Sequence, residues 1–197
     1  MKLIVVIMFV LSFFNSNAQL IGNGDFEVYS RCPVTEGQID RATGWFSNQY
    51  GGTTDYLNTC GFMGVVPAGI TASSGQGYVG LYTFWQESWS GNGKEYLTCQ
   101  LSSPLIAGTN YLLTFKMLSN ITGAYDNTPQ PIAYRGYFGA CFSDGAPLVT
   151  DFQPTYSGAM LSSFGNRVYV DASHAGYTTT NWVSVSLVYT ALGGEQF

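Results

Sequence analysis

The alternation of apolar and polar residues in VSVSLVYT, at 183–190, broken only by Val188, is the feature that most constrains the fold. Residues two apart share one face of a β-strand, so the pattern predicts a strand with one apolar and one polar face. The stretch YLLTFKM, at 111–117, repeats the alternation with Tyr, Leu, Phe and Met. Long alternating strands of this kind favour an all-β fold in which two antiparallel sheets pack face to face as a sandwich.

Shorter apolar and aromatic runs recur along the rest of the chain, separated by clusters of Gly, Asn, Ser and Pro. No long window has helical periodicity, so these runs also indicate strands. The segments 47–77 and 86–96 are rich in turn residues and are predicted to be loops. The predicted strands cover residues 24–29, 42–46, 78–85, 95–101, 111–118, 135–142, 167–170 and 183–190.

The first 18 residues have the pattern of a secretory signal peptide. Lys2 precedes an apolar run at 3–14, and the small residues of SNA at 16–18 provide a cleavage site after Ala18. The run is shorter than the ~20 residues that span a bilayer, which leaves a retained membrane anchor as the weaker alternative. We expect this segment to be removed and residues 19–197 to form one domain of a secreted or cell-surface protein.

Charge is scarce in this chain. Charged residues make up 10% of the sequence, and the formal net charge is −5. Binding to nucleic acid or to an anionic membrane surface needs a clustered basic patch, and the seven Lys and Arg residues form none. The composition therefore argues against both kinds of partner.

The four cysteines, Cys32, Cys60, Cys99 and Cys141, fit an oxidising compartment. None has the C-x-x-C spacing of a zinc or redox motif. Cys32 and Cys60 lie in polar, loop-like surroundings, and a bridge between them is the favoured pairing because it would staple a long loop. Cys99 and Cys141 lie in strand-like runs and are either bridged across neighbouring strands or buried as two thiols.

The segments IGNGDFE at 21–27 and ATGW at 42–45 resemble the start of galactose-binding-like jelly-roll domains, which include carbohydrate-binding modules of xylanases. With GYVGLY at 77–82 and the stretches 95–115 and 181–197, the chain is similar to a jelly-roll domain of secreted and outer-surface proteins of gliding bacteria with type IX secretion. In those proteins the domain often precedes an OmpA-like or sorting domain. Such domains continue past GGEQF with a further short strand, so the resemblance implies that this chain is a fragment of a longer polypeptide and lacks the last strand.

The resemblance also implies a structural calcium ion beside the first strand. Carried onto this sequence, its ligands are the carbonyl of Asp25 and the carboxylate of Glu27, with Glu195 as the nearest match to an acid from the last strand. Calcium takes about six to eight oxygen ligands, so others must come from elsewhere. The alternative is that Glu27 accepts hydrogen bonds from loop amides while Asp25 caps the Asn-Gly turn. In a strand, Phe26 would point away from both acids and enter the core.

The residue sets that catalysis needs are not evident in the sequence. His174 is the only histidine, and no nucleophile-elbow motif accompanies it. A glycosidase needs two carboxylates that face one another across a cleft. Glu87 and Glu95 flank Trp89, but most of the twelve acids are expected on the surface or in turns. We therefore expect a protein that is not an enzyme.

Aromatic residues make up 16% of the chain, and several lie in Gly- and Asn-rich connections. Flat rings beside amide and acid side chains suit the faces and hydroxyls of pyranose sugars. We expect a glycan-binding surface at Trp89, with Trp85, Glu87 and Tyr56 as neighbours. The alternatives are ordinary packing of loops by these rings and, for the whole domain, a structural or adhesive role in which it contacts protein in the cell envelope.

Overall fold

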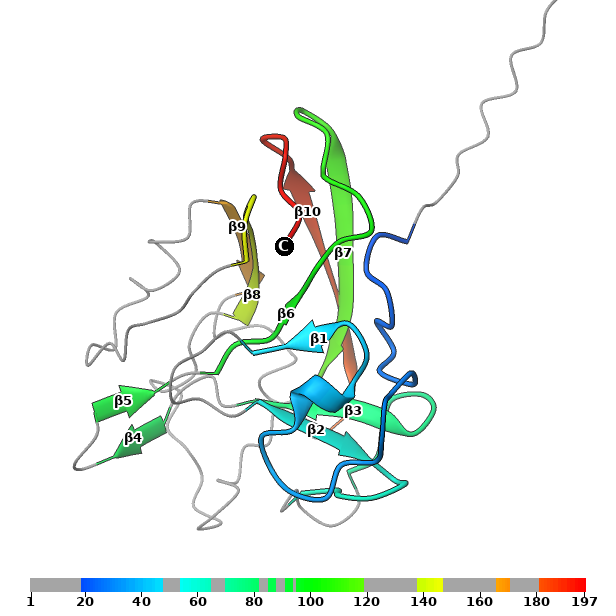
Figure 1. The fold of residues 1–197 in the computed structure, drawn as a ribbon. Helices are drawn as coiled ribbons and strands as arrows, with labels where there is room; N and C mark the ends of the chain where they lie inside the picture. The colour runs from blue at the N-terminus through cyan, green and yellow to red at the C-terminus, as the bar shows by residue number, and fades with distance from the viewer. Residues whose placement is uncertain are drawn as a thin grey trace, which may run out of the picture.

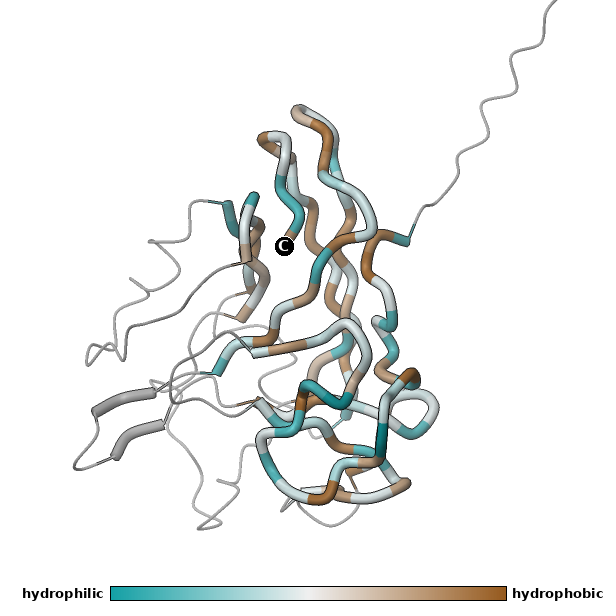
Figure 2. The backbone as a smooth tube through the Cα atoms, in the orientation of Figure 1, coloured by the Kyte–Doolittle hydropathy of each residue, from teal (hydrophilic) through white to brown (hydrophobic). Residues whose placement is uncertain are grey.

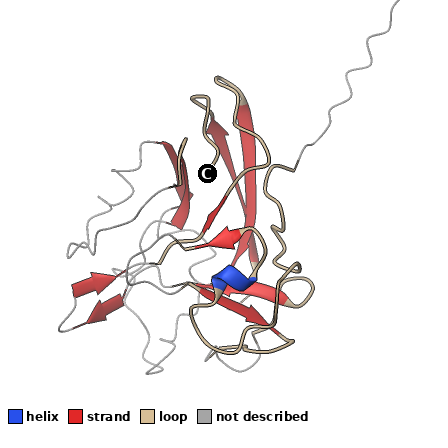
Figure 3. Ribbon diagram, viewed as in Figure 1, coloured by secondary structure: helices blue, strands red, loops and turns tan. Residues whose placement is uncertain are grey.

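The computed structural model describes residues 19–47, 54–64, 70–81, 95–118, 138–146, 166–170 and 181–197, and the backbone of 85–87 and 91–93. These residues form strands joined by loops, and their one helical element is a single 3-10 turn, η1 (Ile39–Arg41) (Figures 1 and 3). No helix among them is long and apolar enough to cross a membrane. The described part of the chain is therefore all-β, as the alternation predicts.

Every strand pair in the described ranges is antiparallel. The pairs are β1 with β6, β2 with β3, β4 with β5, β7 with β10, and β8 with β9. Their bounds are β1 (Trp45–Phe46), β2 (Asp55–Asn58), β3 (Gly77–Gly80), β4 (Trp85–Glu87), β5 (Gly91–Gly93), β6 (Thr98–Cys99), β7 (Asn110–Met117), β8 (Phe138–Phe142), β9 (Asn166–Val170) and β10 (Val183–Thr190).

β7 and β10 are the longest pair, and their register explains the alternation in their sequences (Figure 2). Val185 is paired with Phe115, and Tyr189 is paired with Tyr111, so apolar residues meet across the ladder on the inner face. The exposed fractions of Val185 and Tyr189 are 2% and 5%. The outer face carries mainly Ser, Thr and Asn, as expected for a sheet with one solvated face.

Buried apolar side chains gather in three clusters. Tyr189 lies in the first cluster, Phe115 packs against the second, and Trp45 packs against the third. The buried members are Leu101, Leu105, Tyr189 and Ala191 in the first, Met117, Val170 and Val185 in the second, and Ile39, Ala42 and Tyr56 in the third.

The N-terminal and C-terminal described residues both pair with the segment that follows β6. The carbonyl of Leu20 accepts a hydrogen bond from the amide of Ser102 at 2.8 Å, and Ile21 forms a bridge with Leu101. On the other side of the same segment, the amide of Leu101 donates to the carbonyl of Gln196 at 2.7 Å. The amide of Gln196 then donates to the carbonyl of Ser143, just after β8. Residues 195–197 therefore join the β8 end to the segment after β6.

The strand predictions differ from the structure at several places. Residues 24–29 form turns instead of a strand, because Asn23 and Phe26 have positive φ angles of 52° and 61°. The segment 47–77 contains β2, and the segment 86–96 contains part of the β4–β5 hairpin, although both were predicted to be loops. Of the predicted strand 95–101, only Thr98–Cys99 is paired as a strand. β7, β9 and β10 match their predictions within one residue at each end.

Candidate functional site

The predicted ligand-binding residues fall around the β4–β5 hairpin. Trp85 begins β4 and Glu87 ends it, so the two occupy alternate positions on one face of the strand. The register pairs Trp85 with Gly93 and Glu87 with Gly91. Both partners are glycines, so neither residue has a directly opposite side chain on the facing strand. Trp89 lies in the connection 88–90, outside the described residues.

Tyr56, the fourth predicted binding residue, belongs to the core. Its exposed fraction is 0%, its hydroxyl donates to the carbonyl of Phe26 at 2.8 Å, and the side-chain amide of Asn58 donates to that hydroxyl at 2.9 Å. Burial raises the pKa of the phenol. The prediction of Tyr56 as an exposed stacking surface is therefore wrong, because the ring sits on the buried face of β2 and has no free face for a sugar.

The N-terminal turn, residues 22–28, is held by Asn23. The side-chain amide of Asn23 donates to the carbonyls of Val28 and Thr43 at 2.8 and 2.9 Å, and its oxygen accepts from the amide of Val28 at 2.8 Å. The backbone carbonyl of Asn23 accepts from the indole of Trp45 at 2.8 Å. Asparagine is among the few residues with a side chain that tolerate a left-handed conformation, which suits it to this position.

Glu27 uses its carboxylate to hold a second turn, residues 75–77. One carboxylate oxygen accepts hydrogen bonds from the amides of Gln76 and Gly77, both at 2.8 Å. Gly75 has a φ of 65°, and a Cβ there would overlap the carboxylate. The sequence left two roles open for Glu27. The structure shows the role in which its carboxylate accepts hydrogen bonds from loop amides. Asp25 is exposed, and its carboxylate accepts from the amide of Glu27 at 3.5 Å.

Glu195 is buried and fully engaged at the end of β10. One of its carboxylate oxygens accepts from the hydroxyl of Tyr189 at 2.6 Å and from the amide of Leu192 at 2.8 Å, and the other accepts from the amide of Gly193 at 2.7 Å. Burial alone raises the pKa of this carboxyl, but the hydrogen bonds to the charged form outweigh it and lower the pKa. The carboxylate of Glu195 thus closes its own turn (Gly193 and Gly194 both have positive φ).

The calcium ligands that the resemblance implies are the carbonyl of Asp25 and the carboxylates of Glu27 and Glu195. Asp25, Glu27 and Glu195 are all described, and no three His, Cys, Asp or Glu residues among the described ones group as a metal site. Glu27 and Glu195 each hold backbone amides of different turns. The structure thus shows amide-holding roles for the carboxylates of Glu27 and Glu195, and calcium binding stays a prediction.

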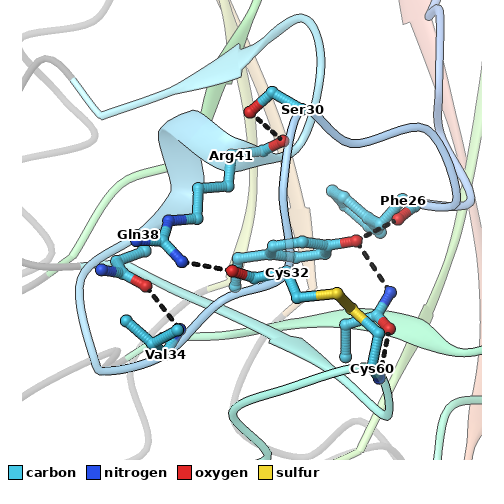
Figure 4. The surroundings of a disulfide bond; sticks show 9 residues. Phe26, Ser30, Cys32, Val34, Gln38, Arg41 and Cys60 are labelled. Carbon is cyan, nitrogen blue, oxygen red and sulfur yellow. Dashed lines mark hydrogen bonds between the residues drawn. A yellow bond between two sulfur atoms is a disulfide. The ribbon is translucent and has the colours of Figure 1, made fainter.

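The predicted disulfide between Cys32 and Cys60 is present, with the two Cα atoms 5.6 Å apart and a sequence separation of 28 (Figure 4). It ties the loop after the N-terminal turn to the end of β2. The guanidinium of Arg41 donates to the carbonyl of Cys32, and the carbonyl of Arg41 accepts from the amide of Ser30 at 2.9 Å. Arg41 is only 7% exposed, and the hydrogen bond from its guanidinium to Cys32 stabilises this loop.

Cys99 and Cys141 are free thiols, which decides between the two alternatives left open by the sequence. Each is half-buried, Cys99 in β6 and Cys141 in β8. Burial raises the pKa of each thiol to about 11. The thiolate fraction at neutral pH is therefore very small, which makes both thiols poor nucleophiles.

Comparison with known proteins adds no further assignment. No family model, no curated protein and no solved structure matches this chain. The function must therefore be argued from the residues and the geometry above.

Sequence reasoning missed two positioning residues, Asn23 and Gly75. The signal for Asn23 was the Gly-Asn-Gly sequence, which indicates a left-handed turn that interrupts a strand. Gly75 had no comparable signal, because its role depends on a carboxylate 48 residues earlier in the chain. His174 and Trp89 lie outside the described residues, and Glu95 is a buried acid at 7% exposure.

Proposed function

We propose that this chain is an exported, non-catalytic module that binds glycans through the β4–β5 hairpin. In this proposal residues 1–18 are a signal peptide, and the antiparallel pairs complete a jelly-roll sandwich over 19–197. The disulfide and the low charge are consistent with an extracellular setting.

The observation that carries the proposal is the composition and register of the hairpin. Within nine residues it carries two tryptophans and an acid, Trp85, Glu87 and Trp89. The second strand of the hairpin reads Gly-Asn-Gly. The residues paired with Trp85 and Glu87 are therefore glycines, which have no side chain. An indole is a large, flat apolar surface, and a sugar ring can stack on it with its C–H groups while an acid binds the hydroxyls.

A second candidate function rests on the outer face of β7 and β10. Leu112 and Val188 are direct cross-strand partners, and their exposed fractions are 66% and 64%. A pair of large apolar side chains on an outer sheet face is a feature of protein contact sites. It favours the alternative in which the domain is a structural or adhesive part of the cell envelope.

A glycan array probed with the exported chain tests the proposal. We expect binding to a restricted set of polysaccharides, and we expect Trp89→Ala to lose it. The matched control is Tyr169→Ala, which removes a 44%-exposed aromatic ring from β9 and should bind as the wild type does. An empty array, together with capture of envelope proteins that Leu112→Ser abolishes, would favour the second candidate instead.

A further inference from the structure

The sequence Gly-Asn-Gly occurs twice, at 22–24 and at 91–93. Asn-Gly is the dipeptide in which asparagine loses ammonia most readily, because glycine leaves the attacking backbone nitrogen unhindered. The two copies have the same neighbours on both sides, so differences in their reactivity in the folded protein arise from structure. This makes them an internal matched pair.

In the folded protein, the nucleophile of this reaction is accessible, but the electrophile is held in place. Gly24 is exposed, and within the described part of the chain its amide nitrogen, which is the nucleophile, donates no backbone hydrogen bond. The electrophile is the side-chain carbonyl carbon of Asn23, and its carboxamide is fixed by three hydrogen bonds to Val28 and Thr43. A carboxamide held in this way cannot turn toward the Gly24 nitrogen until those bonds open.

We propose that Asn23 is a spontaneous modification site, gated by opening of the N-terminal turn, and that its conversion to aspartate prevents the turn from closing again. The Gly24 nitrogen forms a bond to the side-chain carbonyl carbon of Asn23, and the carbon–nitrogen bond to the amide group breaks. Ammonia leaves with the proton of the Gly24 nitrogen, which gives a cyclic succinimide. One water molecule then opens the ring to aspartate or isoaspartate.

The product cannot make the contacts that asparagine makes. The amide nitrogen of Asn23 is the donor to the carbonyls of Val28 and Thr43. After conversion, a carboxylate oxygen would face the same two carbonyl oxygens, and all three are acceptors. The turn also supplies the Phe26 carbonyl that accepts from Tyr56, so its release would unpair a buried phenol.

Peptide mass spectrometry on the full mature chain tests the gating. The protein is incubated folded and in urea, and the fraction of each Gly-Asn-Gly peptide that has been converted is followed over time. We expect Asn23 and Asn92 to convert at similar rates in urea, and Asn23 to convert at least tenfold more slowly in the folded protein. Equal rates for Asn23 with and without urea would overturn the gating.

Two variants test the consequence. Asn23→Asp should lower the melting temperature by several degrees, whereas Gly24→Ala should leave it nearly unchanged and slow conversion at position 23 in urea. Gly24 suits this control because a Cβ there meets only ordinary contacts, the nearest at 3.6 Å. An Asn23→Asp protein as stable as the wild type would overturn the claim that conversion prevents closure. If Asn23→Asp does not fold, the same claim is tested by the loss of stability in folded wild-type protein that has been partly converted.

Discussion

The carboxylate of Glu27 occupies the space that a side chain at Gly75 would need. Two segments that are almost fifty residues apart in sequence are thereby joined, because the same carboxylate binds the amides of residues 76 and 77. The acid in the N-terminal turn is thus part of the scaffold that places β3 against β2.

Gly75→Ala should destabilise the fold by about 2–4 kcal/mol, since it adds a clash with the carboxylate to the cost of a left-handed alanine. Gly108→Ala is the matched control, because Gly108 has a similar φ of 74° but an added Cβ meets nothing within 4 Å. We expect the control to lose only about 1–2 kcal/mol. The free energy of unfolding in urea measures both. Equal losses in the two variants would contradict the role given to Glu27.

Glu27→Gln should lower the free energy of unfolding by about 1–2 kcal/mol, because a neutral amide is a weaker acceptor than a carboxylate for two N–H groups. Calcium and a chelator should each leave the melting temperature of the wild type unchanged, since the carboxylate serves backbone amides. Thermal melts with and without calcium measure this. A calcium-dependent rise that disappears in Glu27→Gln would instead support the calcium site that the resemblance implies.

The pKa of Glu195 is lowered in the folded protein, so its ionisation stabilises the fold. That stability is fully present above the unfolded pKa of about 4.3 and is lost as pH falls through the lower folded value. Melting temperatures from pH 7 to pH 2 should therefore fall more steeply for the wild type than for Glu195→Gln. Parallel profiles would show that Glu195 does not contribute to the acid sensitivity.

Replacing Cys32 and Cys60 together by serine should cost about 3–4 kcal/mol, because the bridge closes a loop of 28 residues. Cys141→Ser removes a free, half-buried thiol and serves as the control, with a smaller expected loss. Urea unfolding of both variants measures the difference. A double variant that is as stable as the control would contradict the structural importance of the bridge.

The sequence predicts those elements whose signal is local and repeated. β10 was predicted with its observed bounds because its apolar residues alternate with its polar ones along most of its length, and burial follows the same alternation apart from the exposed Val188. The prediction of a strand at 24–29 was wrong because Phe26 has a positive φ angle. This conformation is rare for an aromatic residue, and sequence patterns do not indicate it. The turn is held by the local contact of Asn23 with Val28 and by the hydroxyl of Tyr56, which lies 30 residues after Phe26 in the sequence.

The candidate site was predictable only in part. Trp85 and Glu87 were placed beside a flexible tip because Gly and Asn follow them, and the structure adds that these glycines pair directly with both residues. Tyr56 was chosen because its neighbours are turn residues, yet β2 buries it completely. Exposure of a single ring depends on tertiary packing, which local composition does not report.

The measurement that tests the central claim most directly is the affinity of the wild type and of Trp89→Ala for a glycan that the array identifies, with melting temperatures recorded on the same samples. We predict that Trp89→Ala weakens binding by at least about tenfold, or ~1.4 kcal/mol, while its melting temperature stays within a degree or two of the wild type. Tyr169→Ala should match the wild type in both. Unchanged affinity in Trp89→Ala, or a loss that only follows a fall of many degrees in melting temperature, would contradict a glycan-binding surface on this hairpin.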